Sequence, residues 1–245
     1  MIGVYDSGLG GMLLLPELIK KYPNEKFLYL GDRERAPYGT KSKEELEAII
    51  ADNFAFFKRE GITDLVIACN TLCSVIDFSK DYGFKVHDII SKTAKQLVNE
   101  KESNVVVFAT PLTIKLGRYE KELQTLGCNR VYYHALTHLA KLIEDFASED
   151  EIETYLISEF ADLPEKVDAM ILGCTHFPIV KKIFAKHYPN AHIYDSNDLE
   201  FDLTQMNEGH EVIVACKQEP SLDHFINDYV KVDYKYYEKD CTRIG

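Results

Sequence analysis

Short apolar runs alternate along the chain with longer stretches whose apolar residues recur at helical spacing. The runs predict strands over residues 2–5, 27–30, 65–68, 84–87, 105–109, 131–133, 169–172 and 192–194. Between them, charged amphipathic stretches predict helices over residues 42–60, 89–101 and 179–187. Short apolar strands that alternate with helices are typical of parallel sheets covered on both faces. We therefore predict an α/β fold with mainly parallel sheets.

The order of these pieces repeats. Cys69 follows Asp6, at the end of the first strand, by 63 positions, and Cys174 follows Thr110, at the end of the fifth, by 64. The repeat predicts two related halves with a boundary near residues 103–104, although parallel α/β chains can show such spacing by chance. Ligands of open α/β sheets bind beyond the carboxyl ends of the strands. Two halves that face one another would therefore place Cys69 and Cys174 on opposite walls of one cleft.

A cysteine follows two of the predicted strands, in Ala68-Cys69-Asn70-Thr71 and in Leu172-Gly173-Cys174-Thr175-His176. A thiol followed by small hydroxyl and amide residues suits proton transfer or nucleophilic attack. A single cysteine after an apolar run is usually a packing residue, but two in matching positions favour chemistry on two faces of one small substrate. The remaining cysteines lack this context and are predicted to be structural: Cys73, Cys128, Cys216 and Cys241.

The net charge and the hydropathy of the chain argue against a nucleic-acid partner and against a membrane segment. The 245 residues carry a formal net charge of −12, which argues against a nucleic-acid surface because phosphate binding needs clustered Lys and Arg. The amino terminus does not resemble a secretory leader, and no apolar run reaches the length of a spanning helix, so we expect a cytoplasmic protein without a membrane segment. Six scattered cysteines indicate free thiols in a reducing compartment.

Two loops after strands offer polar groups to a ligand. Residues 6–11 (Asp-Ser-Gly-Leu-Gly-Gly) allow backbone amides to approach an anion, but their spacing is not the dinucleotide fingerprint, so we predict no nucleotide cofactor. Residues 31–41 contain a turn fixed by Pro37 and Gly39, where Tyr38 can offer a hydroxyl and an aromatic wall. His134 and His138 are spaced for one helix face, yet no further ligand completes a zinc pattern, and we predict no metal.

These motifs together resemble those of the glutamate racemases, in the aspartate/glutamate racemase superfamily. The resemblance rests on residues 6–11, 31–32, 37–39, 68–71 and 172–178, in the family's order. It implies two pseudo-symmetric α/β domains, with the active site in the cleft between them. These would be residues 1–97 plus about 207–245, where the tail returns to the first domain, and residues 98–206. It also implies a cofactor-independent enzyme that interconverts L- and D-glutamate for cell-wall peptidoglycan, commonly as a homodimer.

The resemblance also assigns roles to individual residues. Racemisation removes the α-proton from one face and returns a proton to the other, so two acid/base groups must flank the carbon. Cys69 and Cys174 take these places, and Asp6 and His176 would shuttle protons beside them. Groups that bind the amino acid would be Asp6, Ser7, Tyr38, Gly39, Asn70, Thr71, Thr175 and His176, with Tyr38 and Gly39 at the side-chain carboxylate. Glu144 and Thr113 lie in segments that match the family less closely and are further candidates.

Departures from the family pattern concern the choice of substrate. Leu72 stands where the family has a small residue, Arg33 replaces a threonine, and Leu116 replaces a serine. These changes leave open the racemisation of aspartate or another acidic amino acid. A further alternative is a non-catalytic module that binds a ligand or a partner. That alternative gives no reason for the intact pair of cysteines. A pyridoxal-dependent mechanism is disfavoured because no segment resembles its Schiff-base lysine loop.

Overall fold

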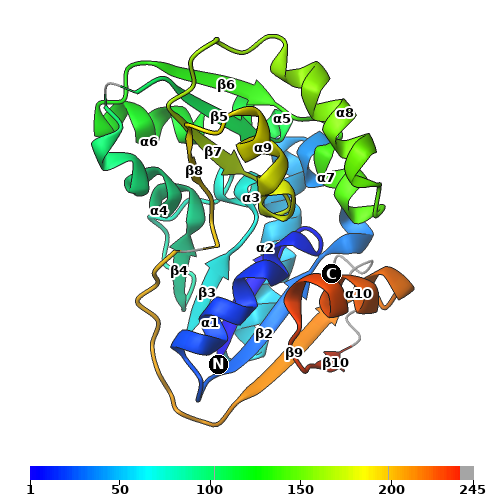
Figure 1. Cartoon of the computed structure of the whole chain (residues 1–245). Coiled ribbons are helices and arrows are strands. Elements are labelled where there is room, and N and C mark those ends of the chain that lie inside the picture. Colours follow the sequence, from blue (N-terminus) through cyan, green and yellow to red (C-terminus); the bar gives the residue numbers. More distant parts are fainter. Residues whose placement is uncertain (102, 198, 238–245) are drawn as a thin grey trace. The chain divides into compact units, whose positions relative to one another are not determined.

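A computed structural model describes residues 1–101, 103–197 and 199–237. The chain forms two compact units (Figure 1). Of the described residues, unit 1 contains Met1–Ile89 together with those from Asn197 to Tyr237, and unit 2 contains those between Ile90 and Ser196. The sequence placed the corresponding limits at residue 97 and at about residue 206. Among the described residues, no helix combines the length and the apolar character needed to cross a membrane.

Unit 1 is built on a six-stranded sheet in the order β10-β9-β2-β1-β3-β4, and all its strand pairs are parallel. The strands are β1 (Ile2–Asp6), β2 (Lys26–Gly31), β3 (Asp64–Ile67), β4 (Lys85–Asp88), β9 (Glu211–Cys216) and β10 (Lys235–Tyr237). The central strands β1 and β3 are buried along their whole length. This burial explains why they appear in the sequence as continuous apolar runs rather than as alternating patterns.

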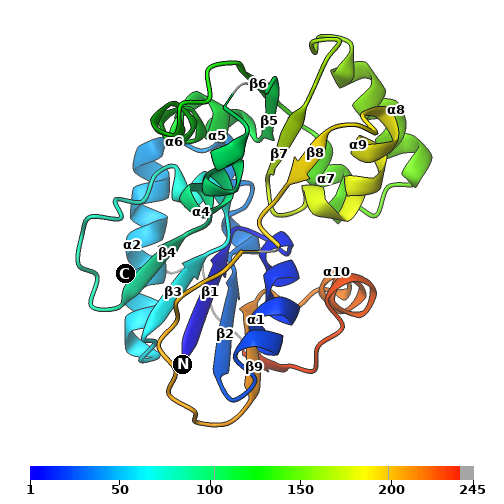
Figure 2. The ribbon, with the colours of Figure 1, turned by 60° about the vertical axis from the view of Figure 1, so that its left-hand side comes forward.

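Helices cover both faces of this sheet, and Figure 2 shows α1 and α2 on opposite sides of it. The helical elements are η1 (Gly10–Leu14), α1 (Leu15–Lys21), η2 (Arg33–Arg35), η3 (Tyr38–Thr40), α2 (Lys43–Arg59), α3 (Asn70–Cys73), α10 (Pro220–Phe225) and the π-helical η6 (Ile226–Val230). The start of α2 is fixed by a capping box, in which Ser42 Oγ accepts a hydrogen bond from the Glu45 amide and the Glu45 carboxylate accepts one from the Ser42 amide.

Unit 2 has a four-stranded parallel sheet in the order β6-β5-β7-β8. Its strands are β5 (Val105–Ala109), β6 (Val131–Ala135), β7 (Ala169–Gly173) and β8 (His192–Tyr194). Its helical elements are α4 (Ile89–Lys95), which begins at the last residue of this part of unit 1, η4 (Gln96–Asn99), α5 (Pro111–Lys115), α6 (Arg118–Leu126), α7 (Leu139–Glu144), α8 (Glu149–Phe160), η5 (Phe177–Val180) and α9 (Lys181–His187). Phe108 of β5 packs against both Phe160 and Phe184, with ring centroids 6.0 and 5.1 Å away, and so joins α8 and α9 to the sheet.

The two units share a strand order. In each, the first strand along the chain lies between the second and the third, and the fourth pairs with the third: β2-β1-β3-β4 in unit 1 and β6-β5-β7-β8 in unit 2. The direction of winding therefore reverses between the first and third strands of both sheets. In open α/β sheets this reversal leaves a crevice at the carboxyl ends of the strands, where ligands bind.

The predicted α/β class with mainly parallel sheets is confirmed. All eight predicted strands are present, with ends within two residues of those expected, and the three predicted helices correspond to α2, to α4 with η4, and to η5 with α9. Strands β9 and β10 were not predicted. They extend the sheet of unit 1 beyond β2.

Candidate functional site

Most predicted site residues of unit 1 lie at the ends of β1 and β3, the strands on either side of the reversal in winding. Asp6 ends β1, and its Oδ1 accepts a hydrogen bond of 2.7 Å from the Gly8 amide, which folds the chain sharply after the strand. This turn places Ser7 Oγ 3.5 Å from Cys69 Sγ. Asp6 is 1% and Cys69 6% exposed, so the carboxyl group and the sulfur both lie in a largely water-free environment.

Gly11 allows η1 to pack directly on this corner of unit 1. A Cβ atom at Gly11 would lie 2.7 Å from Asp6 Cβ and 2.8 Å from Ala68 Cβ, closer than real Cβ atoms approach one another. The glycine cluster that the sequence suggested for anion binding therefore has a packing role at Gly11. It lets the segment after β1 lie against the ends of β1 and β3.

Asn70 and Thr71 form the first turn of α3 and are each 3% exposed. The next two residues, Leu72 and Cys73, are completely buried. Burial, together with the nearby Asp88, raises the pKa of Cys73 well above the ordinary value of a thiol. Cys73 therefore stays protonated at neutral pH, and its Sγ lies 3.4 Å from the Ile67 carbonyl oxygen, to which it donates.

The loop after β2 is held by a buried polar network. Asp32 is completely buried, and its Oδ2 accepts hydrogen bonds from Arg35 Nε at 2.7 Å, from Asn53 Nδ2 at 3.1 Å and from the Tyr38 hydroxyl. The Tyr5 hydroxyl lies 3.0 Å from that of Tyr38 and accepts a bond of 2.6 Å from Asn53. Burial, aided by the charge of Asp32, raises the pKa of Tyr5, and burial raises that of Tyr38, so both phenols stay neutral.

This network determines what Tyr38 can offer to a ligand. The side chain is 1% exposed, and its hydroxyl already bonds Asp32 and Tyr5. Arg35 extends the network to α2 through Asp52 Oδ2 at 2.9 Å and Asn53 Oδ1 at 2.7 Å. Sequence reasoning missed Tyr5, Asn53 and this role of Arg35, because these residues are far apart in the chain and belong to no common motif.

The predicted site residues of unit 2 follow β7. Cys174 comes directly after the strand and is 8% exposed, and Thr175 and His176 lead into η5. His176 Nδ1 lies 3.8 Å from Cys174 Sγ, and its Nε2 lies 2.8 Å from Glu144 Oε1 at the end of α7. Glu144, a minor candidate in the sequence, is thus brought to the imidazole.

The surroundings of His176 favour its charged form. Burial lowers the pKa of the imidazole, but the hydrogen bonds to Cys174 and Glu144 and the negative charge of Glu144 more than offset this, and the pKa lies well above its ordinary value. These contacts therefore favour the imidazolium form of the ring. A protonated imidazole beside a sulfur can donate a proton to it and accept one back.

Thr113 lies in the corresponding place after β5. It is 1% exposed, belongs to α5, and its Oγ1 lies 2.9 Å from Thr110 Oγ1. Leu116 caps the carboxyl end of the same helix. Thr113 and Thr110 therefore support the turn after β5 in the way that Asp6 and Gly8 support the turn after β1.

The placement of His134 and His138 on one helix is wrong. His134 belongs to strand β6, where its Nε2 lies 2.8 Å from Glu159 Oε2, and His138 precedes α7 and packs its ring against Tyr155. A spacing of four residues is also compatible with a strand end followed by a turn, which is the case here. The described residues contain no group of three or more His, Cys, Asp or Glu side chains suited to hold a metal ion.

The cysteines within the described ranges are buried thiols: Cys69, Cys73, Cys128, Cys174 and Cys216. Cys241 lies outside the described residues.

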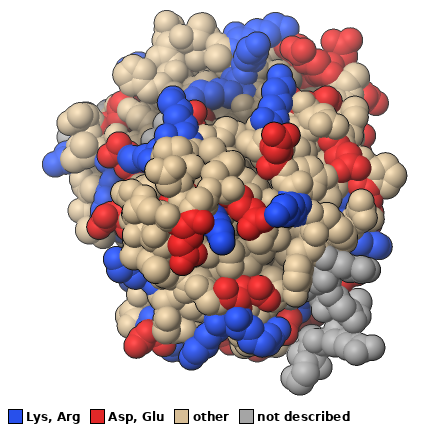
Figure 3. Space-filling model, turned by 90° about the horizontal axis from the view of Figure 1, so that it is seen from below, with Lys and Arg blue, Asp and Glu red and all other residues tan. Residues whose placement is uncertain are grey.

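On the face drawn in Figure 3, Lys and Arg side chains are interspersed with Asp and Glu.

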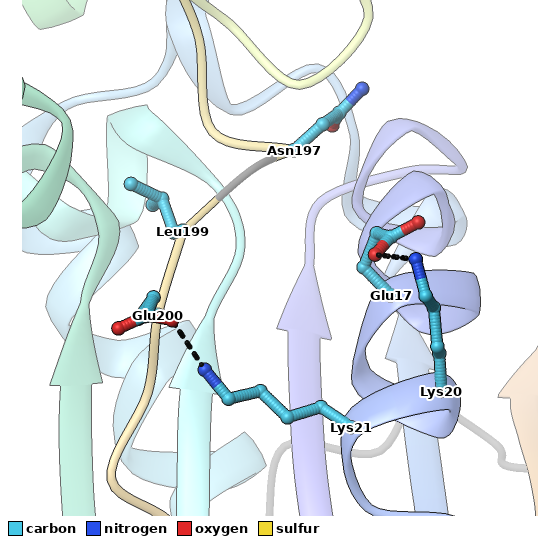
Figure 4. Close-up of a pocket in the computed structure, with 6 residues that line it drawn as sticks. All are labelled: Glu17, Lys20, Lys21, Asn197, Leu199 and Glu200. Atoms are coloured by element: carbon cyan, nitrogen blue, oxygen red, sulfur yellow. Dashed lines mark hydrogen bonds and ion pairs between the residues drawn. The ribbon is translucent and has the colours of Figure 1, made fainter.

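A cavity of about 370 Å³ in unit 1 contains none of the predicted site residues. Figure 4 shows it between α1 and the segment that returns from unit 2, where Lys21 Nζ lies 2.9 Å from Glu200 Oε1 and Lys20 Nζ lies 3.6 Å from Glu17 Oε2. Its lining is Glu17, Lys20, Lys21, Asn197, Leu199 and Glu200. The two lysines are paired with the glutamates of the same cavity, so the cavity offers no unpaired lysine to an anion.

Comparison with known proteins agrees with the motifs and the fold. A model of the Asp/Glu/hydantoin racemase family matches residues 17–204. The chain is 34% identical over 200 residues to a glutamate racemase of Aquifex aeolicus, covering 80% of this chain and 78% of the relative. It is 35% identical over 193 residues to glutamate racemase 2 of Caldanaerobacter subterraneus, covering 74% and 70%.

Solved structures show the same likeness at the level of the fold. The crystal structure of a glutamate racemase isoform from Bacillus anthracis superposes with a TM-score of 0.90 at 26% identity, covering 98% of this chain and 97% of that one. The family match covers most of the chain, and the two curated relatives each share more than 30% of the aligned residues. The chain therefore belongs to the Asp/Glu/hydantoin racemase family and is an isomerase, an amino-acid racemase.

Proposed function

We propose that this protein is a cofactor-independent glutamate racemase in which Cys69 and Cys174 are the two acid/base groups. The observation that carries the proposal is the equivalent placement of the two sulfurs. Each follows the third strand of its sheet, next to the reversal in winding, and each has a polar side chain close by in its own unit: Ser7 Oγ lies 3.5 Å from Cys69 Sγ, and His176 Nδ1 lies 3.8 Å from Cys174 Sγ. The glutamate racemases among the similar proteins support the choice of substrate.

The reaction explains why two thiols are needed. One sulfur, as thiolate, removes the α-proton from one face of the amino acid, and the other, as thiol, delivers a proton to the opposite face. Their roles exchange when the reaction runs backwards. The mechanism requires the two sulfurs to face the same α-carbon from opposite sides, which we propose for the bound state.

In unit 1, Cys69 would work with Asp6 and Ser7. The Ser7 hydroxyl lies 3.5 Å from Cys69 Sγ, within hydrogen-bonding distance of a sulfur. Asp6 is oriented by its bond from the Gly8 amide. We propose that Asp6 moves protons to and from Cys69 and binds the substrate ammonium group.

In unit 2, Cys174 would exchange protons with His176. The protonated imidazole is held by Glu144, so its Nδ1 is directed towards the sulfur while Nε2 is bonded to the carboxylate. When Cys174 has delivered its proton to the carbanion, the imidazolium can restore it. Glu144 is then a positioning residue that acts through His176.

The remaining candidates would bind the substrate. Asn70, Thr71 and Thr175 are each no more than 4% exposed and lie directly beside the cysteines in the chain, where they can bind the α-carboxylate and stabilise the developing charge. Because the Tyr38 hydroxyl is already bonded to Asp32 and Tyr5, we propose that the backbone amides of Tyr38 and Gly39 bind the side-chain carboxylate. Thr113 would support the turn after β5.

The cellular role is part of the same proposal. D-glutamate made here would supply peptidoglycan synthesis in the cytoplasm, and the enzyme would act as a homodimer. The support is the resemblance to glutamate racemases.

Circular dichroism of D-glutamate with the dialysed enzyme and no added cofactor tests the activity. We expect the optical activity to be lost with the wild type and to persist with C69S or C174S. C73S is the matched control and should behave as the wild type, because Cys73 is a buried, protonated thiol in the same helix as Asn70. A stable optical signal at high enzyme concentration would refute glutamate racemisation. Leu72 and Arg33 depart from the family pattern and leave the choice of substrate open. Incubation with a panel of acidic amino acids that includes aspartate, followed by chiral chromatography, then decides whether one of them is preferred to glutamate.

A further inference from the structure

The loop formed by residues 31–41 is fixed at two sides within unit 1. On one side, Arg35 binds Asp32 and reaches Asp52 and Asn53, the latter two on α2. On the other side, Arg33 reaches the carboxyl-terminal segment formed by residues 211–237. The loop also carries Tyr38 and Gly39, so whatever fixes the loop also fixes these residues.

The contacts of Arg33 are specific and largely shielded from water. Its Nη2 donates to Ser221 Oγ at 2.9 Å and lies 3.1 Å from Glu219 Oε2. The side chain is 14% exposed, against 37% for that of Glu219. Glu219 is the residue before α10, and Ser221 lies in its first turn, so one guanidinium nitrogen joins the loop to the start of this helix.

The pairing is not that of an ordinary surface ion pair. Arg33 Nη1 is buried and has no hydrogen-bond partner among the described residues, so the guanidinium has lost water on one side and depends on the bonds made by Nη2. A charged hydrogen bond of this kind is stronger than a neutral one, and breaking it leaves a buried charge. The position of the loop is therefore coupled to the position of α10.

We propose that Arg33 is a positioning residue of the substrate site, through which the carboxyl-terminal segment holds the loop of residues 31–41. The proposal rests on the proposed function, because it takes Tyr38 and Gly39 to bind the side-chain carboxylate. It gives a role to a segment outside the family match, which ends at residue 204. It also accounts for the arginine at a position where the resembled family has threonine.

Steady-state kinetics of the full chain with glutamate test this proposal. In R33T the loop loses its attachment to α10, and we expect KM to rise about tenfold while kcat changes by less than about twofold, because ground-state binding is lost and the cysteines are untouched. R33K keeps a cation opposite Glu219 and should recover part of the loss. S221A and E219Q should each raise KM, and combining either with R33T should add little, because both act through Arg33.

K217A is the matched control. Lys217 Nζ lies 3.3 Å from Glu219 Oε1, on the same carboxylate that Arg33 contacts, and its side chain is 54% exposed, so KM should stay unchanged. Equal KM values for R33T and the wild type, or a fall in kcat at constant KM, would overturn the positioning role. A lowered melting temperature in R33T with unchanged kinetics would overturn it too, because Arg33 would then be only structural.

Hydrogen exchange without substrate separates this proposal from the proposed function. The Ala36 amide bonds the Arg33 carbonyl oxygen and the Lys41 amide bonds that of Tyr38, so both report on the loop. R33T should accelerate their exchange and K217A should not. If R33T accelerates exchange but the wild-type protein does not racemise glutamate, the attachment of the loop to α10 is supported and the proposed function fails. If exchange is unchanged, the attachment itself is refuted.

Discussion

Glu144 Oε1 lies 2.8 Å from His176 Nε2, on the side of the ring opposite to Cys174. The carboxylate orients the imidazole and stabilises its charged form, so both ring nitrogens are engaged within unit 2. From the sequence, Glu144 was only a further candidate, because its segment matches the resembled family less closely. Glu144 precedes His176 by 32 positions in the sequence, and the fold brings the two side chains into contact.

Replacing Glu144 by glutamine tests this arrangement. The amide keeps a hydrogen-bonding group but removes the negative charge, so the pKa of His176 should fall. Protonated His176 loses its proton as pH rises through this pKa, and the alkaline limb of the kcat profile should therefore move to lower pH. We expect kcat at neutral pH to drop by about tenfold to a hundredfold, measured by circular dichroism across a pH series. An unchanged limb would show that Glu144 does not act on His176.

Replacing Arg35 by methionine tests the buried network around Asp32. The variant removes the cation that pairs with a completely buried carboxylate, and removing one partner of such a pair costs about 3–5 kcal/mol. Urea unfolding should show this loss in the free energy of unfolding. The Arg35 side chain is 11% exposed, whereas Lys43, in an exposed pair with Glu47, provides a control whose removal should cost less than about 1 kcal/mol.

Replacing Gly11 by alanine tests the packing of η1. The new methyl group would meet Asp6 Cβ and Ala68 Cβ at less than 3.0 Å, so the ends of β1 and β3 must shift. We expect a loss of about 1–3 kcal/mol in the free energy of unfolding, with a fall in kcat because Asp6 moves relative to Cys69. A variant with wild-type kcat and stability would contradict the close packing.

Asp64 provides a test of stability against pH. Its Oδ1 lies 2.8 Å from His87 Nε2, and its Oδ2 accepts a bond of 3.1 Å from the Thr204 amide. Burial raises the pKa of this carboxyl, but the hydrogen bonds from His87, Thr204 and Thr63 outweigh it and lower the pKa below its ordinary value. The stabilisation is therefore complete above the unfolded pKa, near about 3.9, and is lost as pH falls through the folded value.

The corresponding variant is D64N. At pH 7 it should unfold about 1–3 kcal/mol more easily than the wild type in urea. The difference in the free energy of unfolding between the two proteins should shrink as the pH is lowered below about 3.9. The wild type then loses the charge that the variant lacks. A gap that stays constant down to pH 2 would show that the charge of Asp64 does not stabilise the fold.

Sequence patterns predicted those parts of the molecule that depend on contiguous residues. The central strands are buried on both faces and therefore appear as apolar runs, and Cys69 and Cys174 follow them directly. The Tyr5, Asn53 and Asp32 network is assembled from separate elements, so no local pattern marks it. Strand β9 has an apolar run in Val212–Ala215 that could have been recognised, whereas the three residues of β10 lie among charged neighbours and give no such signal.

The pairing of β9 with β2 has a consequence for synthesis on the ribosome. Unit 2 is a continuous stretch of chain, but the sheet of unit 1 stays incomplete until residues 211–216 have emerged, so β2 ends the nascent sheet with open backbone groups while all of unit 2 is being made. An unprotected edge of this kind can pair with another chain. Nascent chains stalled between residues 90 and 210 should accordingly be the species most prone to aggregate and most dependent on chaperones.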